Sequence, residues 1–329
     1  MLEAGKGSPL RERLLHLFVL LAMLGGSGAT CPRNRQLVND YAPTVLNSEA
    51  TLEDVVRVVN ANSARIQQLQ SSGATLTLAG VPPLETSYAL DRPRRFRLRA
   101  ETRITGPELD LGSNDEIYWV WVKRNEQPAI YWGKHAEFDK STARDIVPIP
   151  PDWLIQALGV VEIDPTARHE GPFRSRPGQL EIRSHLVMNQ REVTKVMVID
   201  DARGWVLEQH LYDANQQPIA SSVASAFQFD QVHGVSLPRF VEIRLPPAGL
   251  SFSLQTDRHL VNQLSGDPNQ LWTMPQITGV PTIDLASPDA LGLRANNPLM
   301  ARRPQRSSAL DAPARDTAVR RLPPFDRVR

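Results

Sequence analysis

The sequence predicts a mainly β protein in which an antiparallel meander sheet is covered by helices. Three observations predict it: segments in which apolar and polar residues alternate, short turn-rich links between these segments, and one long amphipathic helix ahead of them. Because helices do not alternate with strands along the chain, a parallel doubly wound sheet is not expected. A meander of this size must close on itself or be capped by helices to hide its apolar face.

The first 30 residues predict an export signal. Arg11 and Arg13 precede an apolar run, Leu14–Leu24, that is too short to cross about 30 Å of hydrocarbon as a helix. The single cysteine, Cys31, follows Gly28-Ala29-Thr30, where a bacterial lipobox would place it. We expect cleavage before Cys31 and a lipid anchor on its thiol. The alternative is an ordinary secretory signal with an incidental cysteine.

Charge is distributed unevenly along the chain. The net charge is +1, but residues 294–329 hold nine Arg against three Asp, and residues 31–293 hold 25 basic and 31 acidic side chains. The near-zero total argues against nucleic acid as a partner. We divide the chain into a signal peptide (1–30), a tether (31–47), one β domain (48–293) and a tail (294–329).

The tail is rich in Arg and Pro and has no apolar period, so we expect it to be disordered. Its charge suits anionic lipid or the cell wall as a partner, and a solvated tail without a partner is the alternative.

The clearest helix is predicted from Ser48 to Gln70. Thr51 and Asp54 have the spacing of a capping box, and Gly73 is the expected stop. Apolar residues at a period of 3.6 mark the face that covers a sheet or a cavity: Leu52, Val55, Val56, Val59, Ile66 and Leu69.

Strands follow the helix. From Phe96 to Ile104, apolar residues alternate with charged ones that include Arg95, Arg97 and Arg99, which predicts one dry face and one face in water. Ile117–Val122 is apolar on both faces and is expected to be covered on both. A short helix is predicted at Asp152–Leu158. The other predicted strands are Thr75–Leu78, Ala129–Trp132, Leu180–Met188, Val193–Ile199, Trp205–Tyr212, Ser221–Phe229, Arg239–Leu245 and Leu250–Thr256.

No catalytic motif stands out. The sequence has no GxSxG or phosphate-binding loop, its seven His are scattered, and Cys31 is assigned to the anchor. We therefore expect neither an enzyme nor a cofactor. Asp110–Glu116 is acidic enough to suggest a calcium loop, but it lacks the alternating ligand register, and a turn into the next strand is the favoured interpretation.

Aromatic residues gather between positions 96 and 138, mostly on adjacent strands: Phe96, Tyr118, Trp119, Trp121, Tyr131, Trp132 and Phe138. A packed core is the first interpretation, because Trp and Tyr bury large areas in any fold. The alternative is the lining of an apolar cavity suited to acyl chains.

Several segments together resemble one known family. Phe229–Ile243 contains a Gly-x-x-Leu-Pro step between two strands, and Asn262 follows the next strand. Leu271–Pro275 resembles a closing aromatic-then-proline segment, and Pro93–Leu98 resembles the entry to a strand. Over roughly residues 48–280, this pattern resembles the periplasmic lipoprotein carrier and outer-membrane lipoprotein receptor proteins (LolA/LolB-like).

The resemblance implies a half-open antiparallel β-barrel, a curved sheet with helices over its concave face and an apolar cavity for acyl chains. Five strand residues would line this cavity: Phe96, Leu98, Trp119, Trp121 and Trp132. Leu52, Val55, Val56 and Val59 would face it from the helix. The carriers' cavity arginine cannot be assigned to a residue of this sequence, because Arg95, Arg97 and Arg99 are expected to point outward. The segment Pro148–Gly178 and the tail have none either.

The leading hypothesis is a lipoprotein of the cell envelope that is anchored through Cys31, with the outer membrane as the expected site, and that faces the periplasm. Its domain would bind acyl chains or lipoproteins without catalysis, for lipid or lipoprotein transfer. The alternative is a structural or interaction lipoprotein with a filled core, which binds the cell wall or a partner through its basic tail. A hydrolase with a nonlocal site is the third hypothesis.

Overall fold

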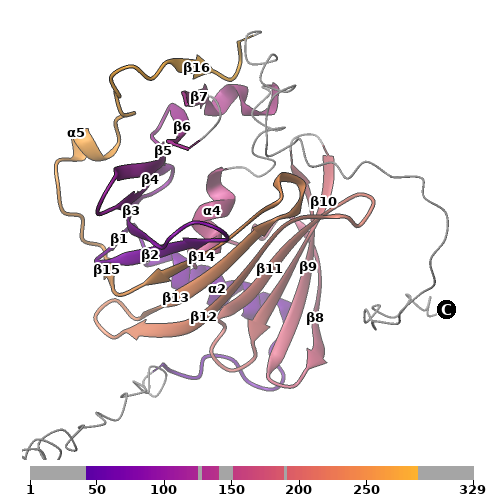
Figure 1. Cartoon of the computed structure of the whole chain (residues 1–329). Helices are drawn as coiled ribbons and strands as arrows, with labels where there is room; N and C mark the ends of the chain where they lie inside the picture. The colour runs from indigo at the N-terminus through magenta and orange to yellow at the C-terminus, as the bar shows by residue number, and fades with distance from the viewer. Residues whose placement is uncertain (1–41, 125–127, 141–150, 189–190, 288–329) are drawn as a thin grey trace, which may run out of the picture.

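The computed structural model describes residues 42–124, 128–140, 151–188 and 191–287, which form one large curved sheet with helices (Figure 1). The predicted signal, Cys31 and the tail lie outside the described residues. The first half of the sheet consists of β1 (Gln68–Ser71), β2 (Ala74–Leu78), β3 (Leu84–Asp91), β4 (Arg95–Thr102), β5 (Gly106–Ser113), β6 (Ile117–Val122) and β7 (Ile130–Lys134).

The second half consists of β8 (Arg168–Arg176), β9 (Gln179–Met188), β10 (Arg191–Asp200), β11 (Val206–Asp213), β12 (Pro218–Asp230), β13 (Val235–Leu245), β14 (Leu250–Thr256), β15 (His259–Val261) and β16 (Thr282–Asp284). The α-helices are α2 (Leu52–Ala64), α4 (Pro151–Ala157) and α5 (Pro268–Leu271). The 3₁₀ helices are η1 (His135–Lys140) and η2 (Pro246–Ala248).

The sheet is open. Its order is β16-β7-β6-β5-β4-β3-β2-β14-β13-β12-β11-β10-β9-β8, with β1 and β15 beside this path. Among the described strands, only β16 pairs in parallel, with β7. The two outermost strands, β16 and β8, do not pair with each other. The predicted half-open barrel, mainly β with a helical cover, is therefore confirmed.

Helix α2 begins directly after the predicted capping residue Thr51, later than the predicted start at Ser48, and it also ends earlier than predicted. The Thr51 hydroxyl accepts a hydrogen bond from the Asp54 amide, and the Asp54 carboxylate accepts one from the Thr51 amide, which completes the capping box. The predicted end at Gln70 is wrong, because the helix stops at Ala64. The side chain of Asn262 accepts hydrogen bonds from the Gln67 and Gln68 amides and donates one to the Arg65 carbonyl, so it supplies partners just past the helix end.

Ile66 and Leu69 continue the apolar stripe beyond α2, but they are buried in the turn after the helix and in β1. Over so few residues, a helical period of 3.6 cannot be distinguished from the alternation of a short strand. Residues 68–71 form a strand because they pair with β3 and β15.

Strands that the sequence analysis did not anticipate complete the sheet. Alternation in β3 and β5 is hidden by polar and small residues, and β8 lies in the segment without a family counterpart. Asp110 was expected in a turn, yet it lies within β5, and the turn is confined to residues 114–116. The short helix at Asp152–Leu158 is confirmed as α4.

Both longer helices lie on one face of the sheet, which we call the inner face. Val55 and Val59 of α2 pack on Leu180 and Ile182 of β9 and on β10. Trp153 and Ala157 of α4 pack on β11 to β13, while Ile155 contacts the cluster that contains β3 and β4 residues. Helix α4 therefore bridges the two arms of the curved sheet (Figure 1).

Residues 268–285, which we call the C-terminal strap, cover the opposite, outer face of β4 to β7 with their first part, up to Val280, and then pair with the edge of β7 as β16. The strap carries α5 and β16 and runs along the edge of the first arm (Figure 1). Met274, Ile277 and Val280 pack against Trp119, Trp121 and Ile130. The sheet is thus buried on both faces at β6, as the sequence predicts.

Candidate functional site

The residues predicted to line a cavity from the strands lie on two faces of the sheet. Phe96 and Leu98 point to the inner face, where they share a buried cluster with Ile155 and Leu158 next to α4. Trp119, Trp121 and Trp132 lie on the outer face under the strap. Leu98 pairs with Leu111, and Trp119 pairs with the next residue of β5, Gly112. Because successive residues of a strand point to opposite faces, Leu98 and Trp119 lie on opposite faces of the sheet.

The helix residues predicted to face the cavity gather in a third place. Val55 and Val59 are buried between α2 and the β9–β10 pair, and Leu52 and Val56 are partly buried against the same cluster. Of the nine predicted residues, Val59 alone also lines the cavity described next.

A cavity of about 370 Å³ lies beside α2. Its mouth is marked by exposed lining residues, Val45, Arg57, Ala61 and Arg65. The remaining lining residues come from the segment before α2, from α2, from the segment after α4, from residues 203–206, from β12 and from residues 234–236: Pro43, Val58, Val59, Asn62, Ser63, Gly159, Val161, Arg203, Gly204, Trp205, Val206, Phe227, Phe229, Gly234 and Ser236. The volume falls within the range of small-molecule sites, about 300–1,000 Å³.

Stacked aromatic rings form part of the wall. Trp205 and Phe227 lie with ring centroids 4.8 Å apart and an interplanar angle of 5°, and both side chains are buried. Ala226 precedes Phe227 and has a φ of 53°, a conformation that residues other than Gly rarely adopt. Before Ala226, the buried residues of β12 are even-numbered, namely Ala220 and Ser222. After Ala226 the buried residue is the odd-numbered Phe227, so the alternation of buried side chains changes at Ala226.

Three arginines stand among the lining residues. The Arg203 guanidinium lies 5.0 Å from the Trp205 ring centroid, and its buried Nε has no hydrogen-bond partner among the described residues. Arg65 donates a 2.7 Å hydrogen bond to the Gly234 carbonyl. Arg57 pairs with Asp54 on the exposed side of α2. The site thus combines apolar walls with cationic groups.

Two asparagines hold α2 over this cavity. The Asn62 side chain accepts a 2.8 Å hydrogen bond from the Ser236 amide and donates a 3.1 Å bond to the Ser236 carbonyl. Asn60 makes the same pair of contacts with Ile163, both at 2.8 Å. Gly204 has a φ of 67°, and a Cβ there would collide with Val58. Helix α2 is therefore held on one side by Ile163 and on the other by Ser236, and it packs closely against Gly204.

The outer face contains a buried ion pair that corrects one prediction. Arg97 was expected to point into water, but it is 5% exposed. Its Nη2 lies 2.7 Å from Asp110 Oδ2, and its Nη1 donates a 2.6 Å hydrogen bond to the Gln270 carbonyl of the strap. Asp110 also accepts a 3.0 Å bond from Trp119 Nε1. The strap covers a strand face that periodicity alone assigns to solvent.

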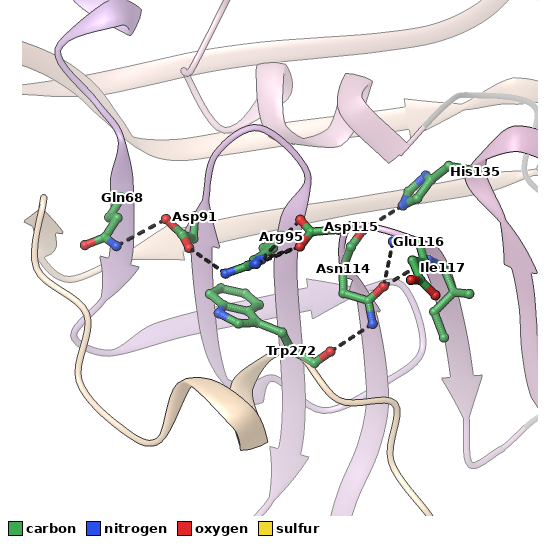
Figure 2. Close-up of polar contacts among 9 residues, drawn as sticks. All are labelled: Gln68, Asp91, Arg95, Asn114, Asp115, Glu116, Ile117, His135 and Trp272. Atoms are coloured by element: carbon green, nitrogen blue, oxygen red, sulfur yellow. Dashed lines mark hydrogen bonds and ion pairs between the residues drawn. The ribbon is translucent and has the colours of Figure 1, made fainter.

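A line of polar contacts runs along one end of the same strands (Figure 2). Arg95 bridges Asp91 and Asp115, and its hydrogen bond lowers the pKa of Asp115. Asn114 Nδ2 donates a 3.1 Å hydrogen bond to the carbonyl of Trp272, and Asn114 Oδ1 accepts from the Glu116 and Ile117 amides. These contacts fix the β5–β6 turn to the strap.

The acidic segment Asp110–Glu116 therefore has structural partners. Asp110 bonds Arg97, Asp115 bonds Arg95, and the Glu116 amide donates a hydrogen bond to Asn114 Oδ1. Within the described ranges, no group of three or more His, Cys, Asp and Glu side chains is placed to hold a metal ion. No helix in the described part of the chain is long and apolar enough to cross a membrane.

A second polar cluster lies inside the barrel, under α4. Lys195 of β10 is 5% exposed and donates a hydrogen bond to Gln156 Oε1, while Gln209 Nε2 bonds the Gln156 carbonyl at 3.0 Å. Lys195 makes no ion pair with another described residue. Burial lowers its pKa to about 8.

Comparisons with known proteins give likenesses in fold. No protein-family model and no curated protein sequence matches this chain. Among solved structures, a domain named for outer membrane lipoprotein sorting from Vibrio parahaemolyticus is 11% identical, with 67% of this chain and 96% of that one covered and a TM-score of 0.45. A LolA superfamily protein from Nitrosomonas europaea is 9% identical, with 68% and 98% covered and a TM-score of 0.43.

A DUF1329 family protein from Desulfovibrio piger is also similar, at 11% identity, with 66% of this chain and 98% of that one covered and a TM-score of 0.43. The Nitrosomonas protein is a member of the superfamily that the sequence resembles. What the site does rests on the geometry of this chain.

Most of the cavity was missed from the sequence. Its residues come from Pro43, Val45 and α2 and from positions more than 90 residues further along the chain, so no local spacing joins the two groups. Two signals were present: Asn60 and Asn62 are polar residues within an amphipathic helix, and Arg203-Gly204-Trp205 places a cation, a turn and an aromatic together.

Proposed function

We propose that this protein binds the acyl chain of an amphiphile in the cavity beside α2 and carries it without catalysis. The observation that supports the proposal is the cavity itself, because stacked rings and valines supply much of the wall of a partly open space of about 370 Å³. An acyl chain suits such a space, since each methylene group removed from water contributes about 0.8 kcal/mol.

Such a cavity would allow an acyl chain to be transferred from one binding partner to another. A chain leaving a membrane or a partner moves from one apolar environment to another, so little free energy separates the two states, and differences in affinity set the direction. Lipoprotein or lipid sorting is the role that we propose on this basis.

The proposal also includes where in the cell the protein acts. We propose an envelope protein, anchored through an acylated Cys31, that faces the periplasm, most simply at the outer membrane. The basic residues 294–329 would add contacts with anionic headgroups or with the cell wall. A second acyl chain or a basic patch is what turns the weak membrane binding of a single chain into stable anchoring.

A displacement experiment tests the cavity. The purified protein is titrated with N-phenylnaphthylamine, a neutral probe that fluoresces in apolar surroundings, and oleic acid is then added as competitor. Ala61→Trp places a large ring at the cavity mouth, and Ala64→Trp, also exposed on α2 but outside the lining, is the matched control. We expect saturable, displaceable binding that is lost in Ala61→Trp alone. Equal binding by both variants would contradict the proposed site.

One observation favours the second candidate, a non-catalytic interaction protein with a filled core. Helix α4 occupies the space between the two arms of the sheet, and the Trp residues on the outer face are packed under the strap. Mass spectrometry after gentle purification separates the candidates, because a carrier retains lipid. Absence of lipid, together with loss of localisation when residues 294–329 are deleted, would favour this second function.

A further inference from the structure

The cavity beside α2 is cationic as well as apolar. Among its 19 lining residues are three arginines, Arg57, Arg65 and Arg203, and no Asp or Glu. Arg57 and Arg65 are exposed at the mouth, Arg203 is partly buried, and Trp205, Phe227 and Val161 form the buried wall. A ligand that fills the apolar part therefore brings its polar end to these guanidinium groups.

Arg203 has the capacity to bind an anion. It makes no ion pair with any described residue, and its buried Nε lacks a hydrogen-bond acceptor. A buried donor without a partner costs free energy, which an oxygen of a ligand would remove. The Trp205 ring, 5.0 Å away, holds the guanidinium in place, so little side-chain freedom is lost when the anion binds.

Arg65 and Arg57 add to this capacity to different extents. The contact of Arg65 is with a backbone carbonyl, so its charge is not neutralised by a carboxylate of the described residues. Arg57 is paired with Asp54, but the Arg57 side chain is 73% exposed, and such a pair is weak enough to be exchanged.

We infer that the ligand is an anionic amphiphile, whose carboxylate or phosphate is bound by Arg203 and Arg65 while its acyl chain enters the cavity. The inference rests on the proposed function and narrows it to one class of ligand. Guanidinium groups favour both anions because their planar donors match two oxygens at once.

The test compares competitors that share one acyl chain. Oleic acid, oleoyl lysophosphatidic acid and neutral monoolein each displace N-phenylnaphthylamine from the full protein. We expect the two anions to act at about tenfold lower concentration than monoolein, which corresponds to about 1.4 kcal/mol. Added salt should weaken the anions alone. Preference for one anion over the other assigns the headgroup as carboxylate or phosphate.

Variants locate the effect. Arg203→Gln and Arg65→Gln should bring both anions to the level of monoolein, while monoolein itself is unaffected. The control is Arg103→Gln, because Arg103 is exposed, pairs with Glu85 and lies outside the cavity. Arg65 is exposed on the surface, so we expect Arg65→Gln to change stability little. Equal displacement by monoolein and the anions would overturn this inference and leave the proposed function standing, whereas failure of all three competitors would overturn the proposed function.

Discussion

Arg97 Nη2 and Asp110 Oδ2 lie 2.7 Å apart on neighbouring strands β4 and β5, and both side chains are almost fully buried under the C-terminal strap. Replacing Arg97 with Leu leaves the buried carboxylate with only the half-exposed Arg99, 3.5 Å away, as a cationic partner, so we expect a loss of about 3 kcal/mol in the free energy of unfolding. The double variant Arg97→Leu/Asp110→Leu should regain much of this loss, because neither charge of the pair is then left buried without the other. Urea unfolding measures both, and equal losses in the single and double variants would contradict the account.

Lys195 makes stability depend on pH. Its pKa in the folded protein is about 8, against about 10.4 for an unfolded lysine, because burial disfavours the charged form. Between these values the unfolded chain binds more protons, so the free energy of unfolding rises with pH, by about 3 kcal/mol in total.

Lys195→Met should remove this rise between pH 8 and pH 10.4. Lys134→Met, at a side chain that is 57% exposed, is the control and should keep it. Urea midpoints measured across this pH range test the prediction. Parallel curves for the two variants would show that Lys195 does not carry the effect.

Asn62 should support both stability and binding. Asn62→Ala removes both hydrogen bonds to Ser236 and leaves buried backbone groups without partners, so we expect a loss of about 1–3 kcal/mol. Because α2 forms one wall of the cavity, the affinity for N-phenylnaphthylamine should fall as well. Asn215→Ala, in an exposed turn, should change stability by less than about 0.5 kcal/mol. An unchanged affinity in Asn62→Ala would mean that this contact does not position the wall.

Cys31 is predicted to carry the lipid anchor. Expression of the full chain in a bacterial host with radiolabelled palmitate should label the wild-type protein and leave Cys31→Ser unlabelled. The same substitution should release the protein from the membrane fraction. Persistent labelling in Cys31→Ser would end the anchor proposal, and release without any labelling of the wild type would indicate an ordinary signal.

The spacing of apolar residues predicted the fold correctly wherever one face of a strand is buried and the other is exposed to water. Thr51 and Asp54 predict the start of α2, and the alternation in β4 places Phe96 and Leu98 on the inner face. The same alternation fails for Arg97, because a segment about 170 residues later covers it. The end of α2 is set by Asn262, which is equally remote in the chain. Contacts of this kind leave no local pattern.

The candidate site was less predictable than the fold. Clustering of Trp119, Trp121 and Trp132 in the sequence indicates a common location, which the structure places under the strap. The clustering of these Trp residues does not indicate whether they lie on the face of the sheet that the helices cover. The cavity depends on how α2 meets the turns around Trp205 and Ser236, and that contact joins three parts of the chain.

Photo-crosslinking tests the central claim most directly. A fatty acid with a diazirine near its methyl end is irradiated with the purified protein, and the labelled peptides are located by mass spectrometry, with excess oleic acid as competitor. We predict labels that oleic acid suppresses on the segments around Val59, Trp205 and Phe227, which form the cavity wall. Labels confined to the Trp119–Trp132 region, or labels that oleic acid does not suppress, would contradict the assignment of the cavity beside α2 as the acyl-chain site.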